Sequence, residues 1–141
     1  MSLTLETDLF FMRRALELAR QAAEEGETPV GCVIAKDGEI IAEGYNKREQ
    51  SKNALYHAEM IAIDAACKVL GGWRLWQCEL FVTLEPCPMC AGAIANAHIP
   101  RVVFGASDNK HASYKPNMES GLLADESAQL LRDFFAKLRH N

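Results

Sequence analysis

The stretch CELFVTLEPCPMCAGAIANA, residues 78–97, contains a predicted strand, a turn with two cysteines and a predicted helix. The apolar run at residues 78–84 indicates a buried strand, and the small apolar residues at 88–97 indicate a helix. Pro88 is compatible with the first helical turn, because the first N–H groups of a helix have no partner within it. Cys87 and Cys90 are therefore expected at the start of a helix, directly after a strand.

The sequence on either side predicts an alternation of helices and strands. Helices are predicted at residues 8–25, 57–70 and 125–139, and strands at residues 30–35, 39–44 and 101–105. Asp37-Gly38 is expected to join the first two strands as a hairpin, and the polar residues 45–56 are expected to form a loop. This order predicts one α/β domain over residues 1–141, with a mixed sheet, helices on both faces and right-handed crossovers between parallel strands.

Composition and charge exclude several classes of protein. The 141 residues are 49% hydrophobic and 24% charged, which is typical of a folded domain. A net charge of −4 argues against a generally basic nucleic-acid-binding protein, although it leaves room for a local basic patch. No apolar run reaches the roughly 18–20 residues that span a bilayer, so no membrane association is expected. Five cysteines without an export signal predict reduced thiols and a cytoplasmic protein rather than disulfides.

Three residues have the pattern of a catalytic zinc site. His57 opens one predicted helix, and Cys87 and Cys90 open the next, where the partial positive charge of a helix N-terminus is expected to stabilise thiolates. Cys-x-x-Cys alone could equally be a redox pair. Together with His57 it supplies three zinc ligands, whereas a structural site needs four, so the fourth position is expected to hold water. Glu59 adds a carboxylate beside this site.

The two motifs together carry a resemblance to a known family. His57-Ala58-Glu59 and Pro86-Cys87-Pro88-Met89-Cys90 form the signature of the zinc nucleobase deaminases. The chain resembles the cytidine deaminase superfamily and, within it, the bacterial tRNA-specific adenosine deaminases. The resemblance also includes residues 29–33, 44–48 and 101–106. It implies a three-layer α/β/α fold with a five-stranded mixed sheet, the fifth strand within residues 113–119, and a homodimer.

The resemblance also implies roles for individual residues. One zinc ion per chain is expected on His57, Cys87 and Cys90. Glu59 is expected to be the general acid/base that takes a proton from the zinc-activated water and delivers it to the base and to the departing ammonia. Contacts to the substrate are implied at Asn46, Ala58, Leu84, Glu85 and Asp108. For Asn46 and Asp108 an ordinary role as turn residues is the alternative.

The sequence leaves the substrate open. One interpretation is a hydrolase that converts adenosine to inosine at the tRNA wobble position, with an anticodon stem-loop as partner. The other is a deaminase of a free nucleobase, nucleoside or related small heterocycle, such as guanine, cytosine or a pterin. The segment at residues 110–120 looks shorter than in tRNA-editing relatives and favours the small substrate, whereas the other matching segments favour tRNA, which we prefer. A non-catalytic zinc module is a third interpretation, and Glu59 argues against it.

Overall fold

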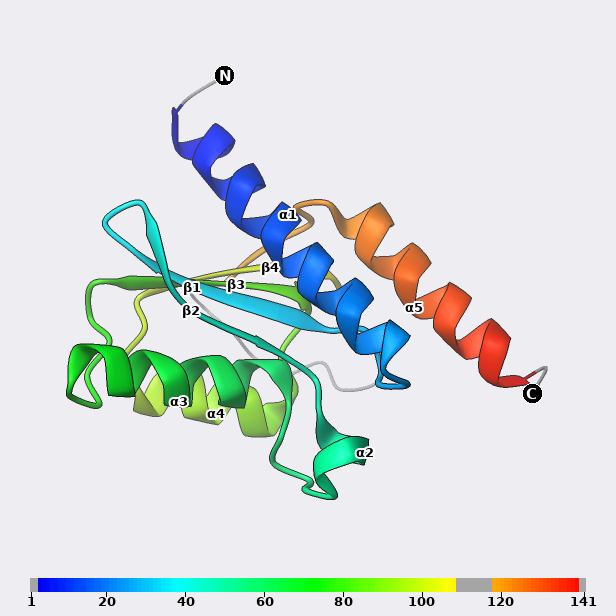
Figure 1. Ribbon diagram of the computed structural model, residues 1–141. Helices are drawn as coiled ribbons and strands as arrows, with labels where there is room; N and C mark the ends of the chain where they lie inside the picture. Colours follow the sequence, from blue (N-terminus) through cyan, green and yellow to red (C-terminus); the bar gives the residue numbers. More distant parts are fainter. Residues whose placement is uncertain (1–2, 109–117, 140–141) are drawn as a thin grey trace.

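A computed structural model describes residues 3–108 and 118–139 of the chain (Figure 1). In chain order its elements are α1 (Leu3–Glu24), β1 (Gly31–Lys36), β2 (Glu39–Tyr45), α2 (Arg48–Ser51), α3 (Ala58–Leu70), β3 (Cys78–Leu84), α4 (Pro88–Asn96), β4 (Arg101–Ala106), β5 (Met118–Ser120) and α5 (Ala124–Arg139). Within the described residues, no helix is both long and apolar enough to cross a membrane.

The five strands form one mixed sheet in the order β2-β1-β3-β4-β5. Strand β1 is antiparallel to β2 and β3, whereas β3, β4 and β5 are parallel. The expected hairpin turn is present, because Asp37 and Gly38 have φ values of 53° and 78°, the positive values that a tight two-residue turn requires. Strand β5 overlaps only the end of the range expected for the fifth strand, whose residues 113–117 lie outside the described part.

Helices cover both faces of the sheet, as predicted. Figure 1 shows α3 and α4 on one face and α1 and α5 on the other. Alternate residues of β1 enter the two cores: Cys32 and Ile34 pack with α3 and α4, whereas Val33 and Ala35 pack with α1. Strand β1 is therefore buried on both sides, which explains its continuous apolar sequence.

Two elements differ from the expectation. Part of the loop predicted at residues 45–56 is the short helix α2, which has too few residues to show a helical period in the sequence. Helix α5 lies where a helix was predicted and carries an apolar stripe, Leu130, Leu131, Phe134, Phe135 and Leu138, but Phe135 is 42% exposed and Leu138 is 55% exposed. The stripe therefore extends beyond the sheet that it covers.

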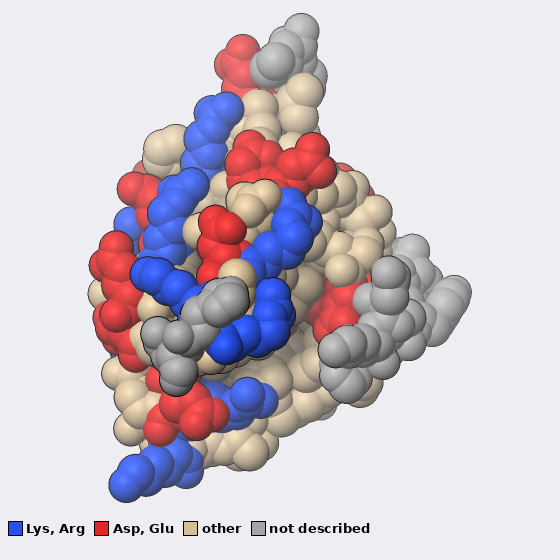
Figure 2. Space-filling model, turned by 90° about the vertical axis from the view of Figure 1, so that its right-hand side faces the viewer, with Lys and Arg blue, Asp and Glu red and all other residues tan. Residues whose placement is uncertain are grey.

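Charged side chains of both signs cover the end of the molecule that carries α2 and the C-terminal ends of α1 and α5. Figure 2 shows this face, with Lys and Arg side chains gathered near its centre and acidic side chains between and around them. Described basic residues in these elements or directly beside them include Lys47, Lys52, Lys137 and Arg139. The net charge of −4 therefore coexists with a local gathering of positive charge.

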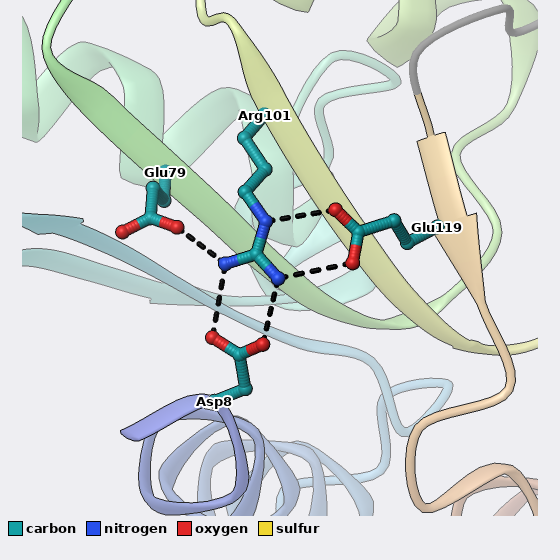
Figure 3. Close-up of polar contacts among 4 residues, drawn as sticks. All are labelled: Asp8, Glu79, Arg101 and Glu119. Carbon is teal, nitrogen blue, oxygen red and sulfur yellow. Dashed lines mark hydrogen bonds and ion pairs between the residues drawn. The ribbon is translucent and has the colours of Figure 1, made fainter. Parts of the chain in front are cut away.

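Arg101 joins four elements at the start of β4 (Figure 3). Its Nη1 and Nη2 donate to the two carboxylate oxygens of Asp8 on α1, at 2.9 and 2.6 Å. Its Nε and Nη2 donate to Glu119 on β5, at 2.8 and 3.0 Å, and Nη1 also donates to Glu79 on β3. The guanidinium therefore links α1 and β5 to the centre of the sheet through paired charge-assisted hydrogen bonds.

Candidate active site

The candidate zinc ligands meet where α3 and α4 begin. His57 and Cys87 are the N-cap residues of these helices, and Cys90 lies in the first turn of α4. Nδ1 of His57 lies 3.6 Å from Sγ of Cys87 and 3.6 Å from Sγ of Cys90. A tetrahedral zinc ion with ordinary bond lengths separates a nitrogen and a sulfur ligand by about 3.6 Å. The three donors therefore fit one zinc ion, and they lie within 4.8 Å of one another.

A glycine brings the start of α3 close to the sheet. A Cβ atom at Gly44 in β2 would lie 2.5 Å from the backbone oxygen of Ala58 and 2.9 Å from the backbone nitrogen of Ala62. Real Cβ atoms essentially never make such contacts, so only glycine permits this separation. Gly44 thus determines how far His57 and Glu59 stand from the strand.

The protonation of the ligands depends on burial. Burial raises the pKa of the Cys90 thiol, and the negative charge of Glu59 raises it further. At Cys90, burial therefore opposes the stabilisation of the thiolate that is expected from the helix N-terminus. Burial and the nearby charge of Arg48 lower the pKa of His57, which favours the neutral imidazole that binds metal.

A cavity of about 750 Å³ adjoins the zinc ligands. Every residue predicted for the site lines it except Cys90, which is fully buried. Glu59, in the first turn of α3, is 4% exposed and faces this space from a position two residues after His57. A carboxylate sheltered from bulk water beside three metal ligands is suited to proton transfer.

Asn46 is held by the protein and still lines the cavity. Its Nδ2 donates to the backbone oxygen of Thr28 at 3.3 Å, and its Oδ1 accepts from the backbone nitrogen of Arg48 at 3.1 Å. The amide has a second N–H and the oxygen a second lone pair, so each group retains capacity for a substrate contact. The two alternatives for Asn46, turn residue and base contact, are therefore compatible.

Glu85 and Asp108 connect two walls of the cavity. The backbone nitrogen of Asp108 donates to Oε1 of Glu85 at 2.9 Å, and the backbone nitrogen of Glu85 donates to Ala106 at 2.8 Å. Glu85 follows β3 and leads into the loop of Cys87, whereas Asp108 follows β4. The ends of two parallel strands thus hold the loops that border the site.

Among the cavity-lining residues that the sequence did not assign to the site, three come from helices α2 and α5. Arg48 comes from α2, and Leu131 and Phe135 come from α5, which lies far along the chain. The helical spacing of Leu131 and Phe135 indicated an apolar face but not its partner. Only the packing of α5 on the sheet shows that part of this face borders the site.

Similarity to known proteins agrees with this geometry. The model of the cytidine and deoxycytidylate deaminase zinc-binding region matches residues 5–106. The chain therefore belongs to this family, and it is a zinc-dependent hydrolytic deaminase with the fold that its sequence predicted.

The proteins that this chain resembles include tRNA deaminases and a guanine deaminase. The tRNA-specific adenosine deaminase of Streptococcus pyogenes serotype M18 is 43% identical over 99% of this chain and 96% of its own. A solved structure from work on A-to-I editing by tRNA:A34 deaminases at the wobble position is 40% identical, with a TM-score of 0.82, over 86% of this chain and 99% of that one. The guanine deaminase of Bacillus subtilis is 44% identical, with a TM-score of 0.68, over 76% of this chain and 66% of that one.

Proposed function

We propose that this protein converts adenosine to inosine at the wobble position of tRNA by hydrolytic deamination. The observation that carries the chemistry is the buried carboxylate of Glu59, which shares one cavity with His57 and Cys87. The tRNA substrate is supported by relatives named tRNA-specific adenosine deaminase that match nearly the whole chain at 42–43% identity.

Each part of the site has a role in this reaction. His57, Cys87 and Cys90 would hold the zinc ion, which would supply Lewis acidity that lowers the pKa of a water molecule toward ~7. A carboxylate oxygen of Glu59 accepts a proton from the attacking water and passes it to the ring nitrogen beside the amino-bearing carbon. Glu59 then takes the proton of the hydroxyl group now bonded to that carbon and gives it to the amino group, so that the C–N bond breaks, ammonia leaves and the carbon becomes a carbonyl.

Other residues orient the base. The remaining N–H and lone pair of the Asn46 amide bind its polar edge, together with backbone groups at Ala58, Leu84 and Glu85. Asp108 lines the cavity next to Glu85, where it would contact the RNA near the target base. The apolar side chains of α5 help to exclude water from the reacting groups.

A second candidate function is deamination of a free base such as guanine. The 44% identity to the guanine deaminase of Bacillus subtilis favours it specifically. The length of the chain is also compatible with it: the match to the streptococcal relative extends over 153 positions, more than the 141 residues here, so that relative has residues without a counterpart. The segment at residues 110–120, which looks shorter than in tRNA-editing relatives, also favours a small substrate.

We also propose a homodimer that works in the cytoplasm. Exposed apolar side chains lie before α3, in its last turn and after it, and they are suited to burial between two copies. They are Leu55, Tyr56, Val69, Leu70, Trp73 and Trp76.

All five cysteines are free, which suits a reducing compartment. Sedimentation velocity should give twice the mass of the chain, and cell fractionation should recover the protein with the cytosol.

The substrate is tested by measuring ammonia release from an anticodon stem-loop and from a panel of free bases and nucleosides. We expect release from a stem-loop with adenosine at the wobble position and none from a matched stem-loop with guanosine there. Affinity for the stem-loop should fall steeply as salt rises, because basic residues that neutralise phosphates release counterions. Turnover of guanine that is insensitive to salt, with no stem-loop turnover, would establish the second candidate instead.

The lysines at positions 110 and 115 provide a further probe, although they lie outside the described residues. Reversing both charges should weaken stem-loop binding at low salt if the substrate is tRNA. It should leave turnover of a free base unchanged if the substrate is small. Asn46→Ala is the companion variant, because it should impair turnover with either substrate.

A further inference from the structure

Glu27 is a buried carboxylate outside the zinc site. It is 1% exposed and lies just after α1, where its backbone nitrogen donates to Ala22 at 2.9 Å. Its side-chain oxygens point to a different element. Oε1 accepts from the backbone nitrogen of Glu49 at 3.0 Å, and Oε2 accepts from the backbone nitrogen of Gln50 at 2.8 Å. Both oxygens are thus used to hold the first turn of α2.

Helix α2 has little stability of its own. It has four residues, and a helix of this length does not form in isolation. Its N-cap residue, Lys47, makes no side-chain capping bond. Instead, the N–H groups of its first three residues are all accepted by side chains: that of Arg48 by Asn46, and those of Glu49 and Gln50 by Glu27. The position of α2 is therefore determined from outside the helix, mainly by Glu27.

The position of α2 matters for the site because the helix carries Arg48. Arg48 lines the cavity beside His57, and Asn46, which caps the same helix, lines it too. The backbone nitrogen of Lys47 donates to Tyr56 at 3.0 Å, which joins this segment to the residue before His57. Glu27 thus connects the rigid end of α1 to the rim of the cavity that surrounds the zinc ligands.

We propose that Glu27 is a positioning residue that holds Arg48 ready to pair with a phosphate next to the target base. This inference rests on the proposed function, because a tRNA substrate has a phosphate beside the target base, whereas the free base of the second candidate function has none. The guanidinium of Arg48 lies 3.8 Å, from Nε to Oε2, from the exposed carboxylate of Glu49, and a phosphate at the rim would offer it two parallel hydrogen bonds. Loss of the carboxylate leaves α2 free to move, so Arg48 contributes less to substrate binding. The zinc ligands and Glu59 lie on other elements and keep their chemistry.

The decisive variant is Glu27→Gln, which keeps the shape of the side chain but replaces one of its two acceptor oxygens with an NH₂ group. Glu27→Asp keeps both acceptors on a shorter side chain, and Glu24→Gln, at the exposed end of α1, controls for the loss of one negative charge nearby. For each variant we would measure zinc content, amide hydrogen exchange by NMR, and kcat and KM on a wobble-adenosine stem-loop. These measurements separate a role in positioning from a general role in stability.

We expect faster exchange in Glu27→Gln at the amides of Glu49 and Gln50, with one zinc ion per chain. The KM should rise about tenfold, as for loss of one charged hydrogen bond, while kcat stays within about twofold. Glu27→Asp should recover part of the loss, and Glu24→Gln should behave as the wild type. Arg48→Ala should raise KM similarly, and adding Glu27→Gln to it should raise KM no further, because both act through one contact.

Three results would overturn the inference: unchanged exchange at Glu49 and Gln50, equal losses in kcat and KM, or a further rise of KM when Glu27→Gln is added to Arg48→Ala. Failure of the proposed function is visible separately, as a wild-type protein that releases no ammonia from the stem-loop. That result removes the phosphate role of Arg48. The exchange rates still decide on their own whether Glu27 holds α2.

Discussion

Replacing Gly44 by alanine tests how closely β2 and α3 must approach to form the zinc site. The new Cβ would stand 2.5 Å from the Ala58 oxygen, whereas ordinary contacts begin at 3.4 Å. Helix α3 would therefore have to recede by about 0.9 Å at its first turn, judged by the usual contact distance. Overpacking of this kind costs about 1–3 kcal/mol. For a domain of this size, that lowers Tm by roughly 3–10 °C.

The displacement of α3 should also weaken zinc binding and slow catalysis. His57 and Glu59 would move with α3, whereas Cys87 and Cys90 are attached to α4. Zinc tolerates deviations of only ~0.2 Å in its ligand distances, so affinity for the metal should fall. A shift of about 1 Å in a catalytic group can also cost about 10²-fold in rate.

The assay compares Gly44→Ala with Gly72→Ala, whose added Cβ would meet nothing within 4 Å. Zinc retention is measured against a graded series of chelator concentrations, Tm by calorimetry, and activity by ammonia release. We expect Gly44→Ala to lose zinc at lower chelator concentration and to lose most of its activity, and Gly72→Ala to match the wild type. Wild-type zinc retention and activity in Gly44→Ala would refute the argument that this close approach sets the geometry of the site.

Three further predictions concern single side chains. Glu59→Ala should retain one zinc ion per chain but release ammonia at least 10²–10⁴-fold more slowly, because a positioned acid/base is removed. Cys87→Ala should lose zinc and melt at a lower temperature, because metal binding is coupled to folding. Arg101 lowers the pKa of Glu119 from 4.5, so this pair stabilises the folded state above that pH and loses its effect as the pH falls through the lowered pKa. Arg101→Gln should therefore weaken the acid dependence of the free energy of unfolding measured with urea.

Each of these three predictions has a measurable result that would contradict it. A Glu59→Ala protein within tenfold of the wild-type rate would mean that another group moves the proton. Full zinc content in Cys87→Ala, measured by elemental analysis, would remove that residue from the ligand set. An unchanged acid dependence of stability in Arg101→Gln would show that the ion pair between Arg101 and Glu119 does not contribute to stability in solution.

Much of the fold followed from patterns that are local in the sequence. The hairpin at Asp37-Gly38 and the strand-to-helix unit at residues 78–97 were predicted correctly, because turn residues and apolar periodicity act over a few neighbouring positions. Helix α2 was missed for the opposite reason: two of its first N–H groups are held by Glu27, more than twenty residues earlier in the chain. No signal within residues 45–56 indicates a helix that depends on a distant carboxylate.

By itself the sequence determined the chemistry, because the ligand types and their spacing at two helix starts already suit one zinc ion and one acid/base. It also determined the mixed α/β fold through the order of its apolar segments. Only the tertiary structure decided which residues surround the zinc ligands and Glu59. Arg48 and Phe135 reach the cavity because α2 and α5 pack beside it, and burial raises the pKa of the Cys90 thiol. Burial and long-range packing depend on residues distant in the chain, so local patterns do not encode them.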